Sequence, residues 1–329
     1  MKILQEETRA LDQQADDRPI LLIDALNLFT RHFAANPTIS THGEHMGGTV
    51  GFLNATKNMV ELCRPKKVIV VWEGGGSFRR RQLFPEYKAT RRPVKLNRFY
   101  EQDIPETTEN RDSQVKAIVG CLRHVNVNQV YVSDCEADDI IAHLSTRKFK
   151  HDDKIIVSSD KDYYQILDDR TRVYRLGKKT FIDKQGVKQE FGISPANFCL
   201  AKALCGDPSD NIPGVEGVGF KTLSKRFPRM LEDEEVELDS IIEECREQAK
   251  KSKTKVYGSI AEARDVIHRN IRIIDLRGSM LTPEQMRKAD HVVDNFVPSP
   301  NKIGLIRELI QLGLNDFNAD SFFYVLSSV

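Results

Sequence analysis

The chain has 329 residues, of which 40% are hydrophobic, and its formal net charge is +1. This composition can form a sizeable folded core, and the near-neutral charge excludes a uniformly basic nucleic-acid-binding protein, so any contact with nucleic acid must come from local patches. No apolar run reaches the roughly 18 residues of a membrane span, no signal pattern precedes the first apolar run, and the six cysteines form no Cys-x-x-Cys pair. We therefore expect a soluble cytoplasmic protein with reduced thiols, no zinc site and no membrane contact.

Apolar runs that fit buried parallel strands recur through the first part of the chain, and helical segments separate them. After a polar lead-in over residues 1–18, the expected strands cover residues 19–24, 66–73, 129–132, 154–157 and 172–176. This alternation predicts an α/β domain over residues 19–193 with a mostly parallel central sheet flanked by helices. From residue 194 to residue 329 the pattern changes to helices joined by turns.

Acidic residues stand at or just after the ends of four of these strands. They are Asp24, Glu73, Glu136, Asp138, Asp139, Asp160 and Asp162. Because the carboxyl ends of parallel strands meet at a shared crevice, we expect these side chains to converge there. So many like charges repel one another unless divalent cations neutralise them, which predicts a metal site. The alternative for Glu136 and Asp139, three residues apart, is a simple preference of acids for a helix N-terminus.

Residues 78–99 form a basic block that contains eight lysine and arginine residues and a single acidic residue, Glu86. A run of charge is usually a solvated helix face. Four aromatic residues interleave with these cations, however, and this favours nucleic acid, because the cations hold phosphates and the rings stack on unpaired bases. An acidic stretch broken by prolines follows over residues 100–112.

The stretch from Cys205 to Leu223 combines acids, prolines and glycines. Asp207 and Asp210 lie three residues apart and could serve only as turn and cap residues. The glycines that follow predict a tight hairpin whose backbone, free of side chains, can approach a phosphate. Lys221 and Thr222 begin the next helix and can also contact an anion. The residues of this predicted hairpin are Gly214, Gly217, Gly219, Lys221 and Thr222.

Six motifs then stand in a familiar order: L-L-I-D-A-L-N, V-V-W-E, L-F-P-E-Y-K-A-T-R, C-E-A-D-D, S-S-D-K-D and G-D-P-S-D-N-I-P-G-V-E-G-V-G. Through them, residues 20–227 resemble the structure-specific 5′ nucleases, which include the 5′-nuclease domain of bacterial DNA polymerase I and phage flap endonucleases. The resemblance implies a PIN-like nuclease core, a helical arch at about residues 78–112 and a helix-hairpin-helix element at about residues 205–227. The last 100 residues match nothing in the family.

The resemblance also implies two groups of acids that bind two Mg²⁺ ions, which Mn²⁺ can replace, about 4 Å apart. The first group would contain Asp24, Glu136 and Asp138. The second would contain Asp139, Asp160, Asp162, Asp207 and Asp210. Glu73 departs from the family, which usually has aspartate at this position, although the longer side chain can still reach a metal ion.

Catalytic roles are implied for residues of the arch. Arg80 and Lys88 match basic residues at the scissile phosphate, Tyr87 and Arg91 match further arch residues, and Arg92 is expected to bind DNA. The helix-hairpin-helix element would grip the backbone of duplex DNA, with a K⁺ ion.

These features predict a 5′-3′ exonuclease or flap endonuclease that acts near a 5′ end or flap junction in DNA, and on RNA primers in RNA–DNA hybrids, during replication or repair. We expect a monomer that works beside a replication protein, in the cytoplasm of its host if a phage encodes it. Two alternatives stay open. One is a catalytically inactive scaffold for branched DNA, motivated by Glu73, and the other is a PIN-like ribonuclease with a smaller acidic cluster.

Overall fold

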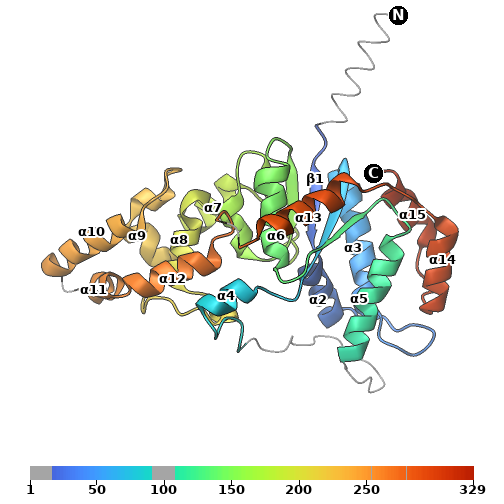
Figure 1. Cartoon of the computed structure of the whole chain (residues 1–329), viewed down its shortest axis with the longest axis horizontal. Coiled ribbons are helices and arrows are strands. Elements are labelled where there is room, and N and C mark those ends of the chain that lie inside the picture. Colours follow the sequence, from blue (N-terminus) through green and yellow to red (C-terminus); the bar gives the residue numbers. More distant parts are fainter. Residues whose placement is uncertain (1–16, 91–107, 253, 279) are drawn as a thin grey trace, which may run out of the picture.

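The computed structural model describes residues 17–90, 108–252, 254–278 and 280–329 (Figure 1). Arg91 and Arg92, much of the predicted arch and nearly all of the predicted lead-in lie outside the described residues. No helix in the described ranges combines the length and the apolar character that crossing a bilayer requires.

One central sheet organises the described residues. Its strands are β1 (Ile20–Asp24), β2 (Lys67–Trp72), β3 (Asn128–Tyr131), β4 (Lys154–Val157), β5 (Thr171–Arg175) and β6 (Thr180–Ile182). The strand order is β3-β2-β1-β4-β5-β6, and every neighbouring pair is parallel except β5 and β6. The predicted mostly parallel sheet is therefore confirmed, and five of its strands lie within a residue or two of the expected ranges.

Successive residues of the strands point to opposite faces of the sheet, and both faces are buried. Ile20 and Leu22 of β1 belong to one apolar layer, whereas Leu21 and Ile23 belong to the other. Because both faces are buried, the sequence of β1 over residues 20–23 is a continuous apolar run with no polar residue at alternate positions. Each of these side chains contributes roughly 1.5–3 kcal/mol by leaving water.

Helices cover both faces. On the face of Leu21 they are α2 (Ala25–Ala35), α3 (Gly47–Cys63), α5 (Thr108–Leu122), α14 (Lys302–Gln311) and α15 (Ala319–Ser327). The layer of Ile20 takes in α6 (Ala137–His143), α7 (Lys184–Phe191), α8 (Pro195–Cys205), α9 (Phe220–Arg226), α10 (Leu238–Lys251), α11 (Lys255–Glu262), α12 (Arg264–Ile274) and α13 (Pro283–Asp294). In Figure 1, α9 to α12 extend from one end of the molecule, and α14 and α15 lie at the other end.

Shorter elements complete the chain. They are α4 (Phe78–Leu83), the π-helix η1 (Leu144–Lys148) and the 3₁₀ turns η2 (Lys161–Ile166), η3 (Pro208–Asp210) and η4 (Pro228–Leu231). The division of the chain at residue 194 stays a prediction, because a single apolar cluster contains residues on both sides of it, such as Ile156 and Ile242.

The segment before α3 differs from expectation. In the sequence, the glycines of residues 43–51 predict a loop in which His42 and His45 lie on the surface, but α3 begins at Gly47 and His45 is buried against the ring of Phe33. The physical reason is close packing: a Cβ atom at Gly47 would lie 1.9 Å from the carbonyl oxygen of Asn36. Glycine here permits a tight helix approach and does not mark a loop.

The strand order fixes where a site can form. The chain runs from β1 to β2 and β3 on one side and then crosses to β4 and β5 on the other, so the switch point lies at β1. Ligands of open α/β sheets bind at the carboxyl ends of the strands beside such a point. Asp24 is the last residue of β1, and Asp160 follows the end of β4 by three residues.

Candidate active site

Most of the predicted metal ligands stand at the N-termini of helical segments. Asp24, Asp160 and Asp207 are the N-caps of α2, η2 and η3, and each side chain accepts a backbone N–H. Glu136 is the residue before α6, whose first turn carries two further acids. Asp207 therefore caps a turn, and capping also accounts for how these side chains are oriented toward the crevice.

Glu136, Asp138 and Asp139 form the first acidic group, in which one carboxylate oxygen from each residue lies within 4.8 Å of the other two. Arg80 of α4 lies beneath this group and is only 1% exposed. Its Nη1 and Nη2 donate to the two oxygens of Asp139 at 2.6 and 2.8 Å, and Nη1 also donates to Glu136 at 2.9 Å. Its Nε donates to the carbonyl oxygen of Ile273 at 2.8 Å. Arg80 is thus the buried counter-ion of the group.

This arrangement changes two expectations. Asp139, implied for the second group, lies in the first one, because the start of α6 places it beside Glu136 and both of its oxygens bind Arg80. The direct phosphate contact implied for Arg80 does not agree with the burial of its guanidinium. Arg80 is positioned to orient the acids. Tyr87 does the same, since its hydroxyl donates to Glu136 at 2.9 Å.

Charges in the first group are unequal. Although burial opposes it, Arg80 and Lys88 favour the charged carboxylate of Glu136 and lower its pKa. Burial raises the pKa of Asp138 well above its ordinary value, and it also raises that of Asp139. A cation that replaces protons at Asp138 would remove this unfavourable burial.

Replacing Arg80 with methionine is expected to lower the free energy of unfolding by about 3–5 kcal/mol without metal, because it leaves buried carboxylates without their counter-ion. The matched control is Arg81→Met in the same helix, whose side chain is exposed and whose loss is expected to cost less than about 0.5 kcal/mol. Urea unfolding in chelator measures both. Equal stability of the two variants would show that Arg80 does not hold the group together.

Lys88 lies at the edge of the first group. Its Nζ donates to Glu136 at 2.8 Å and lies 4.0 Å from a carboxylate oxygen of Asp210. The backbone of Lys88 has a left-handed φ of 59°, and its N–H donates to the carbonyl oxygen of Asp210 at 2.9 Å. Asn211 in turn donates to the carbonyl oxygen of Glu86. The turn that presents Lys88 is therefore fastened to the loop after α8, which brings Asp210 next to the first group.

Glu73 also faces the first group. Its Oε2 accepts the backbone N–H of Ala137 at 3.2 Å, at the start of α6. Burial raises the pKa of Glu73, and the charges of Glu136 and Asp24 add to the effect. The longer side chain of Glu73 therefore still lies in the site, where the charges of Glu136 and Asp24 act on it.

Asp24, at the carboxyl end of β1, is held by two hydroxyl groups. Its Oδ2 accepts hydrogen bonds from the hydroxyls of Ser158 at 3.1 Å and Tyr163 at 3.2 Å. Burial, together with the nearby charge of Asp160, raises the pKa of Asp24 to about 6. A cap role alone would lower this pKa, because an N–H bond favours the charged form. The raised pKa therefore reflects mainly the burial of this carboxylate, with a further contribution from Asp160.

The second acidic group has a cation that we did not expect from the sequence. Lys202 of α8 contacts Asp162 and donates to Asp207 at 2.8 Å. Burial opposes the charge of Lys202, but the acids raise its pKa. Burial and the charge of Asp160 raise the pKa of Asp162 to about 7. The available signal was that Lys202 is the single charged residue of the mainly apolar helix α8, five residues before Asp207.

The donor set fits divalent metal ions. The Oδ1 of Asp138 is buried and accepts no hydrogen bond from any described residue. Every predicted ligand offers carboxylate oxygen, with no cysteine or histidine among them, and such sets suit hard cations such as Mg²⁺. The Oδ1 of Asp138 lies 3.8 Å from Nη1 of Arg80 without a hydrogen bond, in a group of carboxylate oxygens close enough together to bind one metal ion.

The predicted phosphate-binding hairpin is only partly open. Gly217 has a left-handed φ of 73°, and Gly219 is the N-cap of α9, where a Cβ atom would meet nothing within 4 Å. Gly214 has another role, because a Cβ atom there would lie 2.0 Å from the carbonyl oxygen of Cys205. Lys221 is exposed in the first turn of α9. The role of the hairpin in DNA binding stays a prediction.

Comparisons with known proteins agree with this geometry. The family described as 5′-3′ exonuclease, N-terminal resolvase-like domain, matches residues 19–192. A 5′-3′ exonuclease of Buchnera aphidicola subsp. Schizaphis graminum is 29% identical over 216 residues, which cover 64% of this chain and 71% of the relative. The flap endonuclease Xni of Psychromonas ingrahamii is 30% identical over 207 residues, which cover 61% of this chain and 73% of the relative.

Among solved structures, the flap endonuclease of bacteriophage T5 in a complex with DNA and metal ions has a similar fold, with a TM-score of 0.61. It is 20% identical, and the alignment covers 94% of this chain and 99% of the phage protein. The predicted 5′-nuclease fold is therefore confirmed, and the chain belongs to the family of 5′-3′ exonucleases with an N-terminal resolvase-like domain.

Proposed function

We propose that the protein hydrolyses phosphodiester bonds near the junction of a 5′ end or 5′ flap with duplex DNA, with divalent metal ions as cofactors. The observation that carries this proposal is the meeting of the strand-end carboxylates with Lys88 at the switch point of the sheet. The relatives support it, since they are named 5′-3′ exonucleases and flap endonucleases. The phage structure, which contains DNA and metal ions, supports the cofactor and substrate class.

The residues present would hold two Mg²⁺ ions, or Mn²⁺ in their place. Glu136 and Asp138 fit the first position. Asp160, Asp162 and Asp207 fit the second. When bound, divalent metal ions supply an activated water and neutralise charge on the reacting phosphate.

The other side chains prepare this site. Lys88 binds a non-bridging phosphate oxygen and stabilises the charge that develops during cleavage. Arg80 and Tyr87 hold Glu136 in place, as their hydrogen bonds show. Lys202 balances the charge of the second group in the absence of metal.

Finer parts of the proposal follow the family resemblance. The protein cleaves RNA primers in RNA–DNA hybrids as well as DNA, acts as a monomer beside a replication protein, and works in the cytoplasm. A K⁺ ion binds at the hairpin of Gly214, Gly217 and Gly219, where the backbone grips duplex DNA.

Metal binding is expected to depend on pH, because Asp24 and Asp162 have pKa values of about 6 and 7. Both pKa values lie above 3.8, the value for an aspartate in the unfolded chain. Between about pH 4 and pH 7 the metal-free folded state therefore holds more protons than the unfolded state. The free energy of unfolding of the metal-free protein consequently falls as pH rises through this window. Protons also compete with metal. We therefore expect Mg²⁺ to raise the melting temperature more at pH 8 than at pH 5.5, as scanning calorimetry would measure.

The matched variants separate this effect from general titration. Asp162→Asn should lose much of the difference between the two pH values, whereas Asp265→Asn, whose side chain is fully exposed on α12, should keep it. A Mg²⁺ shift of equal size at both pH values in the unchanged protein would show that protons and metal do not share these carboxylates.

The test of the function is a cleavage assay. A 5′-labelled flap duplex and a matching RNA–DNA hybrid are incubated with Mg²⁺ or with chelator, and the early products are sized. Cleavage near the junction only with Mg²⁺ supports the proposal, and product length separates exonuclease from flap-endonuclease action. Cleavage of RNA alone would favour the PIN-like ribonuclease. Binding without cleavage at any divalent ion would favour the scaffold and make Glu73→Asp the next variant.

A further inference from the structure

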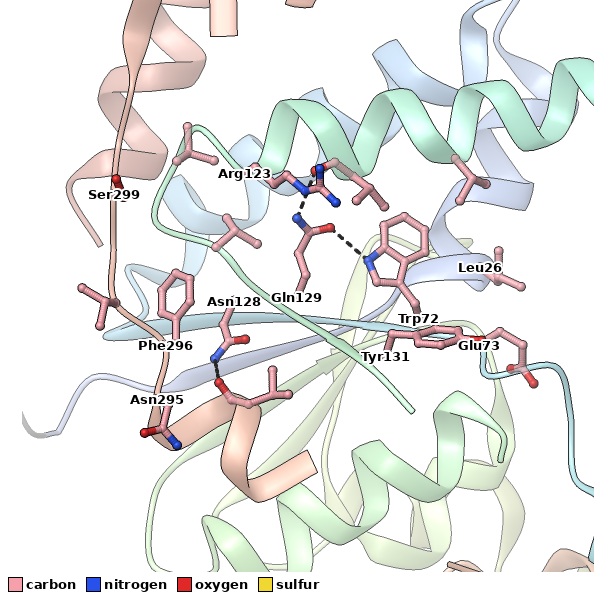
Figure 2. A pocket seen from close by; sticks show the side chains of 16 residues that line it. Leu26, Trp72, Glu73, Arg123, Asn128, Gln129, Tyr131, Asn295, Phe296 and Ser299 are labelled. Carbon is pink, nitrogen blue, oxygen red and sulfur yellow. Dashed lines mark hydrogen bonds between the residues drawn. The ribbon is translucent and has the colours of Figure 1, made fainter. Parts of the chain in front are cut away.

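A cavity of about 720 Å³ lies beside β3, the edge strand of the sheet, and shares Glu73 with the site described above (Figure 2). It lies between α5, the ends of β2 and β3, and the segment that follows α13. Aliphatic side chains form much of its lining. Its aromatic and polar lining residues include Trp72, Arg123, Asn128, Gln129, Tyr131 and Phe296. Apolar walls with a few placed polar groups, at this volume, are typical of a ligand subsite.

The aromatic wall is held in place before any ligand arrives. Trp72 stacks on Phe52 with ring centroids 5.9 Å apart and an interplanar angle of 13°. Its indole N–H donates to the side chain of Gln129 at 3.1 Å, and Gln129 donates to the carbonyl oxygen of Val119. Tyr131, by contrast, is 54% exposed, which leaves its ring available for stacking. A rigid indole and an accessible phenol offer flat apolar faces at a low entropic cost of ordering.

Two polar groups of the cavity lack partners among the described residues. Asn128 is 1% exposed and donates to the carbonyl oxygen of Val292, but its Oδ1 accepts no hydrogen bond there. Arg123 is exposed and forms no ion pair with any described residue. A buried acceptor without a donor is unfavourable, and an unpaired guanidinium attracts anions. The cavity therefore suits a ligand that carries both N–H donors and a negative charge.

Glu73 connects the cavity to the proposed active site. Glu73 lines it and also accepts the N–H of Ala137 at the start of α6. Tyr131 is the last residue of β3, so it stands at the carboxyl edge of the sheet where the acids gather. In Figure 2, Trp72, Tyr131 and Glu73 lie at one end of the cavity and Phe296 lies at the other.

We propose that this cavity binds an unpaired nucleobase of the DNA strand whose phosphate lies at the acidic site. The inference rests on the proposed nuclease function and adds a subsite to it. A base offers apolar faces to the rings of Trp72 and Tyr131 and N–H donors to Asn128. The backbone phosphate next to this base binds Arg123. A peptide added along the free edge of β3 is the competing occupant, but it would require neither the cation nor the connection to Glu73.

The test measures binding with Ca²⁺ in place of Mg²⁺, so that it does not depend on turnover. A single abasic site is moved along the 5′ flap of a duplex, and fluorescence anisotropy gives the Kd for each substrate. We expect one or two adjacent abasic positions to weaken binding by the unchanged protein about tenfold. Tyr131→Ala should weaken binding of the intact flap by a similar factor and abolish the dependence on position. Phe296→Ala should show the same pattern, whereas the control Tyr324→Ala, 78% exposed on α15, should behave as the unchanged protein.

The two proposals can fail separately. Identical Kd values for the unchanged protein, Tyr131→Ala and Phe296→Ala on every duplex would overturn the base subsite and favour a peptide at β3. An abasic pattern that depends on Tyr131, without cleavage in a parallel Mg²⁺ assay, would retain the subsite and overturn the nuclease function. Cleavage with Mg²⁺, without any dependence of Kd on the abasic position, would retain the nuclease function and overturn the base subsite.

Discussion

Replacing Asp160 and Asp162 together by asparagine is expected to lower the rate of cleavage by at least about a thousandfold, because the second metal position loses two of its charged ligands. Asparagine is also a good N-cap, so the cap of η2 survives the change at position 160. Duplex binding should therefore be retained. Single-turnover cleavage and the Kd for a flap duplex measure the two quantities separately.

The control for this pair is Asp265→Asn, which removes an acid from the exposed surface of α12 and should leave the rate unchanged. A metal titration strengthens the test. The double variant should lose most of the stabilisation that Mg²⁺ gives to the unchanged protein. Turnover at the original rate by the double variant would remove Asp160 and Asp162 from the site.

Lys88→Ala is expected to slow single-turnover cleavage by about a hundredfold to a thousandfold, with a much smaller change in Kd. The reason is geometric, since Nζ of Lys88 already lies 2.8 Å from Glu136, at the edge of the group that would hold metal. Its charge can act on the phosphate during the reaction, whereas overall affinity depends on many backbone contacts. Lys88→Met, which keeps most of the aliphatic stem, should show the same loss if the charge is what matters.

A surface lysine provides the comparison. Lys178→Ala removes an exposed cation that pairs with Glu190 beyond β5, and it should leave the rate unchanged. Lys88→Ala should also be more stable than Arg80→Met, because Glu136 keeps its bond to Arg80. An unchanged single-turnover rate in Lys88→Ala would refute a catalytic role for this residue.

The strands and the caps could be predicted from the sequence. A strand that is buried on both faces, such as β1, needs an unbroken apolar run, and such a run is visible in the sequence. The acid at its end, Asp24, then caps the following helix. Both features are local, so they need no knowledge of the rest of the chain.

The grouping of the acids could not be predicted in this way. Asp139 was implied for the second group, but α6 places it beside Glu136, and Arg80 fixes it there. Asp210 lies next to Lys88 because two loops, more than 100 residues apart in sequence, are joined by hydrogen bonds. Distances of this kind depend on the strand order and the packing of loops, and sequence spacing gives neither.

By itself, the sequence determined the chemistry that the site offers. Carboxylates without cysteine or histidine, placed at the ends of parallel strands, specify a crevice that suits hard divalent cations. The tertiary structure decided which of these carboxylates carry charge. Arg80, Lys88 and Lys202 reach the acids from three separate segments, and burial raises the pKa of Asp24 while two of these cations lower that of Glu136. A pKa depends on burial and on distance in space, and only the folded chain sets these two quantities.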